Sequence, residues 1–265
     1  MLLLVDAGNT RIKWALVDAA TELGCWRASG SVSHAEVGTL AQTWQGLQFS
    51  RALLSNVAGA TLRQSLEAAL TGAGLQPRQT AWFASTLQLA GVKNGYRDPA
   101  QLGCDRFASL IGAHALFPLQ ALIVATCGTA TTVDALSADG VFVGGMILPG
   151  VGLMASALAK NTAQLPQVAD GLPGLSLSQA FADNTDAAIV VGCLAAQSGA
   201  IERAVAAHAQ QHVTVLCVVA GGAAAYIAPQ LQVPHKTVDN LVLIGLQVVA
   251  QSTSLATDSN TDTSC

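Results

Sequence analysis

A strand–turn–strand pattern that occurs twice is the feature that most constrains how this chain can fold. The first copy spans residues 1–17 with a polar tip at 6–10, and the second spans 121–136 with its tip at 126–132. The glycines of the two tips stand 120 residues apart. Short apolar runs on either side of turn residues predict β-hairpins. Two such hairpins, one early in each half, predict two similar domains that present their tips to one ligand.

The first tip has an unusual chemical content for a hairpin turn. It carries a carboxylate, a glycine, an amide, a hydroxyl and two cations: Asp6, Gly8, Asn9, Thr10, Arg11 and Lys13. Backbone amides around a glycine can approach an anion closely, and a neighbouring carboxylate can hold hydrated Mg²⁺. The pattern is therefore typical of a site for a metal-bound polyphosphate. A plain surface turn is the alternative, because these residue types are common in turns.

Composition and charge indicate which kinds of molecule the chain can bind. Of the 265 residues, 51% are hydrophobic and only 11% are charged, so the chain can bury a large core, and a dimer could hide further surface. The formal net charge of −4 and the absence of a Lys/Arg cluster argue against a nucleic-acid partner.

The sequence also predicts a chain that neither spans a membrane nor is exported. The apolar stretches near 187–196 and 213–225 are shorter than the roughly 18 residues that a membrane helix needs. No basic lead precedes the first apolar run, which argues against a signal peptide. The six cysteines are scattered without a C-x-x-C pair, so we expect a reducing cytoplasm and neither a zinc site nor a disulfide framework.

Apolar periodicity outside the hairpins alternates between strand and helix, which predicts a mixed α/β fold. The further strands are expected at 24–29, 50–57, 79–83, 142–150 and 214–219, and the helices at 35–44, 61–73, 107–116, 151–160, 187–208 and 240–251. A Pro-, Gly- and Ser-rich loop is expected at 161–178. We expect an N-terminal domain over 1–117, a C-terminal domain over 118–251 and a disordered polar tail over 252–265.

Two further stretches allow either a structural or a functional interpretation. Asp105 stands at the start of an expected helix, where it could simply cap the helix, or could act as a general base with Arg106 as an anion clamp. Gly221 and Gly222 follow an expected strand. They could let a nucleotide lie on the backbone, or could serve tight packing alone.

Taken together, the motifs resemble a known family. In chain order they are Asp6-x-Gly8-Asn9-Thr10, Tyr96-x-x-Pro99-x-x-Leu102-Gly103-x-Asp105-Arg106, Gly128-Thr129-Ala130-Thr131-Thr132-x-Asp134, Gly144-Gly145-x-Ile147-x-Pro149-Gly150, Asn184-Thr185 and Gly221-Gly222-Ala223. From residue 1 to about residue 250 the chain resembles the type III pantothenate kinases of the Bvg accessory factor type.

The resemblance implies an actin-like ATPase (ribonuclease H-like) fold, with two similar α/β domains and an active site in the cleft between them. It also implies ATP-dependent phosphorylation of the primary hydroxyl of pantothenate, the first step of coenzyme A synthesis. A homodimer, Mg²⁺ and a monovalent cation, K⁺ or NH₄⁺, are expected with that activity.

Carried over by position, the resemblance implies a role for each matching residue. Asp105 would take the proton from the pantothenate hydroxyl, and Asp6 would lie near Mg²⁺, through water. The ATP and phosphate contacts would be Asp6, Gly8, Asn9, Thr10, Arg11, Lys13, Gly128, Thr129, Gly221 and Gly222. The pantothenate contacts would be Tyr96, Gly103, Cys104, Asp105, Arg106 and Thr185.

One position departs from the family pattern. An Asp often stands two residues before the glycine of the second tip, where it binds the monovalent cation, but this chain has Thr126. A neutral hydroxyl is a weaker cation ligand than a carboxylate, so the sequence predicts a reduced or altered cation requirement.

Two alternative functions stay open. The first is another kinase or phosphatase of the same superfamily, acting on a sugar, a carboxylate or polyphosphate, although that fold alone would not supply the 96–106 motif. The second is a non-catalytic regulatory protein that binds nucleotide. Loss of Asp6 or Asp105 would favour it, and both are present.

Overall fold

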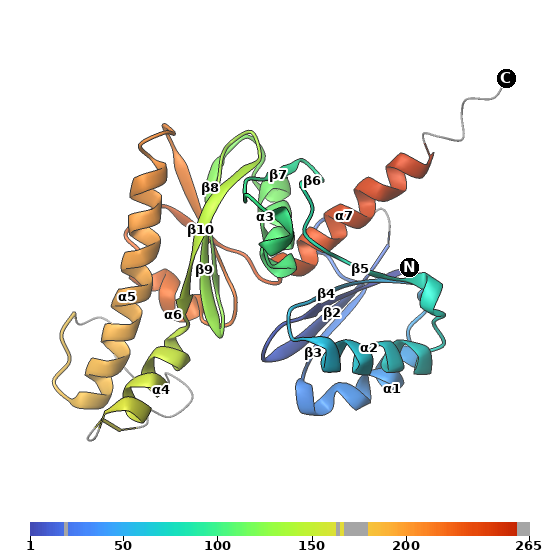
Figure 1. The fold of residues 1–265 in the computed structure, drawn as a ribbon, viewed down its shortest axis with the longest axis horizontal. Helices are drawn as coiled ribbons and strands as arrows, with labels where there is room; N and C mark the ends of the chain where they lie inside the picture. Colours follow the sequence, from blue (N-terminus) through green and yellow to red (C-terminus); the bar gives the residue numbers. More distant parts are fainter. Residues whose placement is uncertain (19–20, 163–164, 167–179, 259–265) are drawn as a thin grey trace. The chain divides into compact units, whose positions relative to one another are not determined.

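The computed structural model describes residues 1–18, 21–162, 165–166 and 180–258, which form two compact units (Figure 1). Unit 1 contains Met1–Pro118, Gly140–Phe142 and the chain from Asn240 onward. Unit 2 contains Leu119–Asp139 and Val143–Asp239.

The two units are built on the same arrangement of five strands. The order is β3-β2-β1-β4-β5 in the five-stranded sheet, and β10-β9-β8-β11-β12 in the second sheet, which continues from β10 to β7 and β6 and so has seven strands. In each sheet the first strand of the hairpin pairs antiparallel with the second and parallel with a later strand, β4 or β11. The repeat predicted from the two hairpins is therefore confirmed as a repeat of sheet topology.

The sheet of unit 1 has helices packed against it. Its strands are β1 (Leu2–Ala7), β2 (Arg11–Val17), β3 (Ala28–Ser33), β4 (Arg51–Asn56) and β5 (Thr80–Trp82). The remaining elements are η1 (His34–Thr39), α1 (Leu40–Gln45), α2 (Ala60–Gly72), η2 (Pro77–Gln79), β6 (Gln88–Leu89), β7 (Val92–Asn94), η3 (Pro99–Gln101), α3 (Cys104–Leu116) and α7 (Leu241–Asp258).

Strand β1 shows how period-2 alternation places this sheet between two helical layers. Leu3 and Val5 lie in one core cluster with Trp44 of α1 and Leu66 of α2. The intervening Leu4 is fully buried as well, and α7 contacts β1, β2 and β4. A strand that is apolar on both faces is the pattern expected of a sheet covered on both sides.

Helices α3 and α7 cross with their backbones in direct contact. A Cβ on Gly245 of α7 would overlap the carbonyl of Ala108 in α3, and a Cβ on Gly112 would lie 2.8 Å from the carbonyl oxygen of Leu241. Because glycine has no side chain, the helices approach more closely than other residues would allow. The segment 241–258, remote in sequence, is thereby fixed against the helix that carries Asp105.

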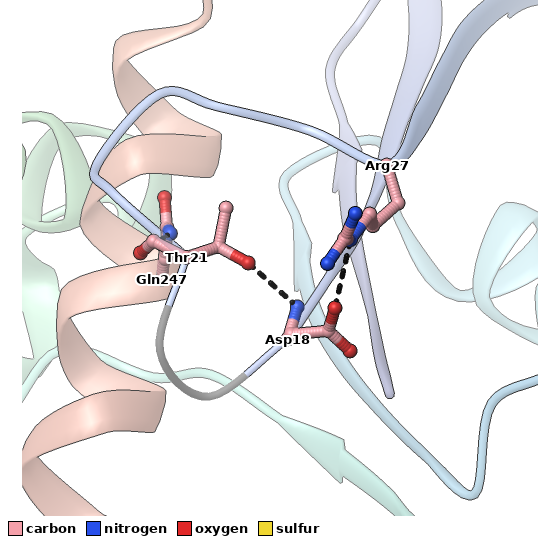
Figure 2. A network of polar contacts seen from close by, with 4 residues as sticks. All are labelled: Asp18, Thr21, Arg27 and Gln247. Atoms are coloured by element: carbon pink, nitrogen blue, oxygen red, sulfur yellow. Dashed lines mark hydrogen bonds and ion pairs between the residues drawn. The ribbon is translucent and has the colours of Figure 1, made fainter.

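A polar strap ties the loop after β2 to α7 (Figure 2). The buried side chain of Gln247 accepts from the amide of Gly24 and donates to the carbonyl of Thr21. The Thr21 hydroxyl accepts from the amide of Asp18, whose carboxylate pairs with Arg27 at 2.8 Å.

Unit 2 is a sheet packed against a long helix. Its elements are β8 (Ala121–Cys127), β9 (Ala130–Leu136), β10 (Val141–Pro149), α4 (Val151–Asn161), α5 (Thr185–His208), β11 (Val215–Ala220), α6 (Ala224–Ile227), η4 (Ala228–Gln230) and β12 (His235–Thr237). The start of β10, Val141 and Phe142, belongs to unit 1 and pairs with Lys93 and Asn94 of β7.

Helix α5 contains one of the two apolar stretches that the sequence analysis judged too short to span a membrane. Among the described residues it is the helix long and apolar enough to cross a membrane by length and composition. Core helices of soluble proteins meet the same criterion. The buried side chains Ile189, Val190, Leu194 and Ile201 belong to the core cluster of unit 2.

Several predicted boundaries differ from the structure. The second tip shrinks from 126–132 to two residues, because the pairing of β8 with β9 continues to Cys127 and Thr131. Strand β3 begins at Ala28 and not at 24, where Gly24 has a φ of +79° and lies in the strap. Helix α3 begins earlier than predicted, at Cys104.

Helix α7 runs beyond its predicted end at 251 to Asp258. Residues 259–265 of the predicted tail, and residues 163–164 and 167–178 of the predicted loop, lie outside the described residues.

We predict that Gly245→Ala destabilises unit 1 by about 2 kcal/mol or more, because the new methyl group must displace the backbone of α3. The matched control is Gly199→Ala on α5, where nothing lies within 4 Å of the new Cβ. There the substitution should stabilise by about 0.5–1 kcal/mol. Denaturant unfolding of both variants measures the difference, and a Gly245→Ala protein as stable as the parent would contradict the direct helix contact.

Candidate active site

The first tip is a three-residue loop between β1 and β2. The amide of Gly8 donates to the carbonyl of Arg11 at 3.1 Å and closes the turn. The side chains of Asn9, Thr10 and Arg11 are exposed, and Arg11 Nε donates to Ser31 Oγ at 2.9 Å. The tip therefore exposes an amide, a hydroxyl and a guanidinium side chain, whose role in binding phosphate stays a prediction.

Asp6 precedes this tip in an environment that opposes ionisation. Burial raises the pKa of Asp6 to about 7, and the nearby charge of Asp105 adds to the increase. Lys13, the residue opposite Asp6 in the β1–β2 register, acts in the other direction. The structure thus brings together two acids that lie 99 positions apart in sequence.

Asp105 lies in the first turn of α3, where Gly103 is the N-cap residue. Burial raises the pKa of Asp105, while the amide of Arg106, which donates to Asp105 Oδ1 at 2.8 Å, opposes the shift. A Cβ on Gly103 would lie 2.7 Å from that same oxygen. The absence of a side chain at Gly103 therefore leaves room for the Asp105 carboxylate. Asp105 thus accepts from an amide in the first turn of α3, as an acidic residue at a helix start is expected to do. This structural role is compatible with a role as general base.

The start of α3 is joined to the end of β4 through Cys104. Its Sγ lies 3.3 Å from the hydroxyl of buried Ser55 and 3.6 Å from the carbonyl oxygen of Asn56. Since β4 pairs in parallel with β1, and Asp6 stands opposite Ser55, this contact helps to set Asp105 near Asp6.

Arg106 is enclosed by aromatic rings. Its guanidinium donates to the Tyr96 hydroxyl at 3.1 Å and lies 5.7 Å from the Tyr96 ring centroid and 5.8 Å from that of Phe142. Asn94 shapes the preceding loop by accepting from the amide of Tyr96 and donating to the carbonyl of Pro99. These contacts hold a nearly buried cation in one orientation.

Sequence reasoning identified Tyr96 and Arg106 but missed Asn94 and Phe142. Asn94 stands just before the 96–106 motif and could have been suspected as a turn-forming residue. Phe142 comes from β10, and nothing in sequence spacing connects it to Arg106.

The second tip, in unit 2, is held by glycines behind it. The amide of Gly128 donates to the carbonyl of Ala130, and the amide of Gly150 donates to the carbonyl of Thr129 at 2.8 Å. A Cβ on Gly221, whose φ is +95°, would overlap the backbone of Cys127. Tight packing therefore accounts for Gly221, whereas a Cβ on Gly222 would have nothing within 4 Å.

Two threonines stand opposite each other across this hairpin, but their hydroxyl groups do not form a hydrogen bond with each other. Thr126 and Thr132 are register partners, and the hydroxyl of each is buried without a hydrogen-bond partner. Asp134, further along β9, is 1% exposed.

Thr185 is the first residue of α5, next to the N-cap Asn184, whose side chain accepts from the amide of Ala187 at 3.0 Å. It lines a largely apolar groove between α4 and α5, with Met154, Leu158 and Ile189 among its walls. Of the predicted site residues, unit 1 holds Asp6 to Lys13 and Tyr96 to Arg106, and unit 2 holds Gly128, Thr129, Thr185, Gly221 and Gly222.

Among the described residues, no group of three or more His, Cys, Asp or Glu side chains could hold a metal ion on its own. The oxygen donors of Asp6 nevertheless fit Mg²⁺, which is commonly bound by one or two carboxylates with water and substrate phosphates as the other ligands. A cation beside the two acids would also relieve their mutual repulsion.

Comparison with known proteins places these motifs in a family. The sequence profile described as type III pantothenate kinase matches residues 2–225. The type III pantothenate kinase of Janthinobacterium sp. (strain Marseille) is 63% identical over 256 residues, covering 94% of this chain and 97% of the relative. That of Herminiimonas arsenicoxydans is 62% identical with the same coverage.

Solved structures support the fold. A protein named as a Baf family transcriptional activator from Campylobacter jejuni aligns with a TM-score of 0.58 at 16% identity, covering 96% of this chain and 99% of that one. A protein named as a 2-dehydro-3-deoxygalactonokinase from Sinorhizobium meliloti aligns with a TM-score of 0.55 at 14% identity, covering the same shares of the two chains. The repeated sheet topology and these neighbours agree with the predicted two-domain, actin-like ATPase fold. From the profile match and the 63% identity, the chain belongs to the type III pantothenate kinase family.

Proposed function

We propose that the protein phosphorylates pantothenate with ATP, giving 4′-phosphopantothenate in the first step of coenzyme A biosynthesis. The observation that carries the assignment, beside family membership, is the juxtaposition of Asp6 and Asp105 next to a donor-rich tip. Phosphoryl transfer needs these components: donors and a metal for the phosphates, and a carboxylate to orient the attacking hydroxyl.

In this proposal the first tip and Asp6 bind the triphosphate end of ATP. Asp6 holds Mg²⁺ through water, and Mg²⁺ supplies positive charge to the phosphate oxygens when it is bound. Asn9, Thr10, Arg11 and Lys13 add donors and positive charge on the same hairpin. In unit 2, Gly128 and Thr129 contribute to ATP binding, with Gly221 and Gly222 for the remainder of the nucleotide.

Asp105 serves as the general base toward the primary hydroxyl of pantothenate. One carboxylate oxygen is held by the Arg106 amide, which fixes the direction of the group. Burial raises its pKa, and a carboxylate of raised pKa is a stronger proton acceptor. Its main contribution is to position the nucleophile, because phosphoryl transfer depends on alignment more than on basicity.

Pantothenate is held by Tyr96, Gly103, Cys104, Arg106 and Thr185. Arg106 is the cation suited to the pantothenate carboxylate, and its ring contacts limit the orientations it can adopt. The side chain of Cys104 faces β4, so its share in this role is to fix the start of α3.

A homodimer in the cytoplasm, with no nucleic-acid or membrane partner, completes the proposal. Exposed apolar side chains on β10 and α4 support a self-association surface: Val143, Ile147, Leu153 and Leu158. Light scattering of the purified protein would report twice the chain mass of 26.9 kDa.

Replacing the base tests the assignment most directly. Asp105→Asn keeps the shape of the side chain and the helix start, so fold and ATP binding should persist while turnover falls by about a hundredfold or more. The measurement is coupled ADP release with and without pantothenate. Absence of pantothenate-dependent ADP from the parent protein would instead favour another kinase of the superfamily or a regulatory protein, and near-normal turnover of the variant would refute the role of Asp105.

Removing the charge of Asp6 should stabilise the metal-free protein. Because its pKa is raised to about 7 from an ordinary value of about 3.9, its ionised form opposes folding, and stability falls as pH rises between those values. Without divalent cation, Asp6→Asn should therefore melt several degrees above the parent at pH 8, and the difference should shrink at pH 5. Glu67→Gln, in an exposed pair with Arg63, is the control and should change melting little at either pH.

Thr126 leads to a prediction about monovalent cations. Its uncharged, buried hydroxyl offers a weak ligand, so activity with K⁺ should exceed activity with Na⁺ or choline only slightly. Thr126→Asp should increase the ratio between these activities, since a carboxylate would face the same position. Initial rates at matched ionic strength measure the ratio, and a steep K⁺ dependence of the parent protein would show that the prediction is wrong.

A further inference from the structure

His34 contacts the first tip from behind. It follows β3 as the first residue of η1, and its Nε2 lies 2.8 Å from the carbonyl oxygen of Gly8. A carbonyl can only accept a hydrogen bond, so Nε2 carries the hydrogen and donates it. No motif of the sequence analysis includes this histidine.

This hydrogen bond fixes the orientation of a peptide group in the tip. The described chain contains no cis peptide bond, and a trans peptide is planar with its C=O and N–H directed oppositely. When His34 holds the Gly8 carbonyl, the amide of Asn9 must point away from His34. The amide of Gly8 itself is already used in closing the turn to Arg11.

In the second tip a loop carbonyl is also held from outside the hairpin, but by a backbone amide and not by a side chain. There the glycine amide also closes the turn, to Ala130, and a loop carbonyl, that of Thr129, accepts from an outside donor. The outside donor is the backbone amide of Gly150, and no side chain is involved. Each tip thus has one braced carbonyl, on the glycine itself in the first tip and on the residue after the glycine in the second.

The backbone around His34 is itself well fixed. Ser33 donates to Glu36 through both its amide and its hydroxyl, at 2.9 and 2.7 Å, and this capping box sets the start of η1. Ser33 is also the register partner of Arg11, at the tip end of β2. The ring is half-buried, so little freedom remains for it to leave the carbonyl.

From these contacts we propose that His34 is a positioning residue for the phosphate tip. It orients the Gly8–Asn9 peptide so that the Asn9 amide can donate to a phosphate oxygen of ATP. The inference rests on the proposed role of this tip in binding ATP. His34 acts through the backbone and need not touch the nucleotide.

Substitutions of His34 that remove the Nε2 donor, or change its distance from the backbone, test the proposal. Glutamine can place its amide nitrogen near the position of Nε2, whereas asparagine is too short. His34→Ala and His34→Asn should raise KM for ATP by about tenfold, the scale of one lost orienting hydrogen bond, and His34→Gln should recover most of it. KM for pantothenate and the melting temperature should change little.

Ser33→Ala is the matched control, because it removes only the hydroxyl bond to Glu36, while the bond from the Ser33 amide to Glu36 still fixes the start of η1 and leaves the His34 ring against Gly8. It should leave KM for ATP unchanged. An unchanged KM in His34→Ala, no recovery in His34→Gln, or an equal defect in Ser33→Ala would overturn the proposal.

Binding of Mg·ATP to the parent protein, measured by calorimetry without pantothenate, separates the two levels of inference. If the parent binds ATP and phosphorylates pantothenate while His34→Ala binds ATP equally well, the role of His34 fails and the proposed function stands. If the parent does not phosphorylate pantothenate, the proposed function itself fails.

Discussion

Unit 1 is built around one constraint, the burial of two acidic side chains, Asp6 and Asp105, close to each other. Asp6 is the penultimate residue of β1, the central strand of its sheet, and Asp105 is the second residue of the largely buried helix α3, so regular elements of the core hold both carboxylates. Burial and mutual repulsion raise the pKa of Asp6, which means that the folded chain alone does not compensate the charge. A fold that retains such a pair sacrifices stability for a site that favours a cation.

Glycines make this placement of the two acids possible, because they have no side chain. Gly103 leaves room for the Asp105 carboxylate, and Gly245 lets α7 lie directly against the helix that carries it. In unit 2, Gly150 and Gly221 let neighbouring segments touch the backbone of the second tip. Backbone contact is less adjustable than contact through side chains, so the positions of the acids and of the tip are set with little freedom.

How much of this could be predicted from sequence depended on the range of the interactions. The paired hairpins and most helices follow from local apolar periodicity, and even the repeat was visible as two glycine-bearing tips. The predicted length of the second tip was wrong, because the pairing of β8 with β9 extends into the segment Thr126 to Thr132, whose residue types are typical of turns. Phe142 and His34 were missed because their partners, Arg106 and Gly8, are set by tertiary packing that no sequence period encodes.

The unequal bracing of the two tips follows from the elements behind them. In unit 2 the strand β10 ends at Pro149 and the chain turns into α4 at Gly150, whose amide reaches the tip directly. In unit 1 the corresponding strand, β3, is followed by η1, and the side chain of His34 spans the distance to the carbonyl of Gly8. A backbone brace survives any substitution that keeps the fold, whereas a side-chain brace can be lost by one mutation. The equivalence of the two sheets therefore extends to one braced loop carbonyl in each tip, although this carbonyl belongs to Gly8 in the first tip and to Thr129, the residue after the glycine, in the second. Only the first tip is braced by a side chain, that of His34, which lies outside every motif of the sequence.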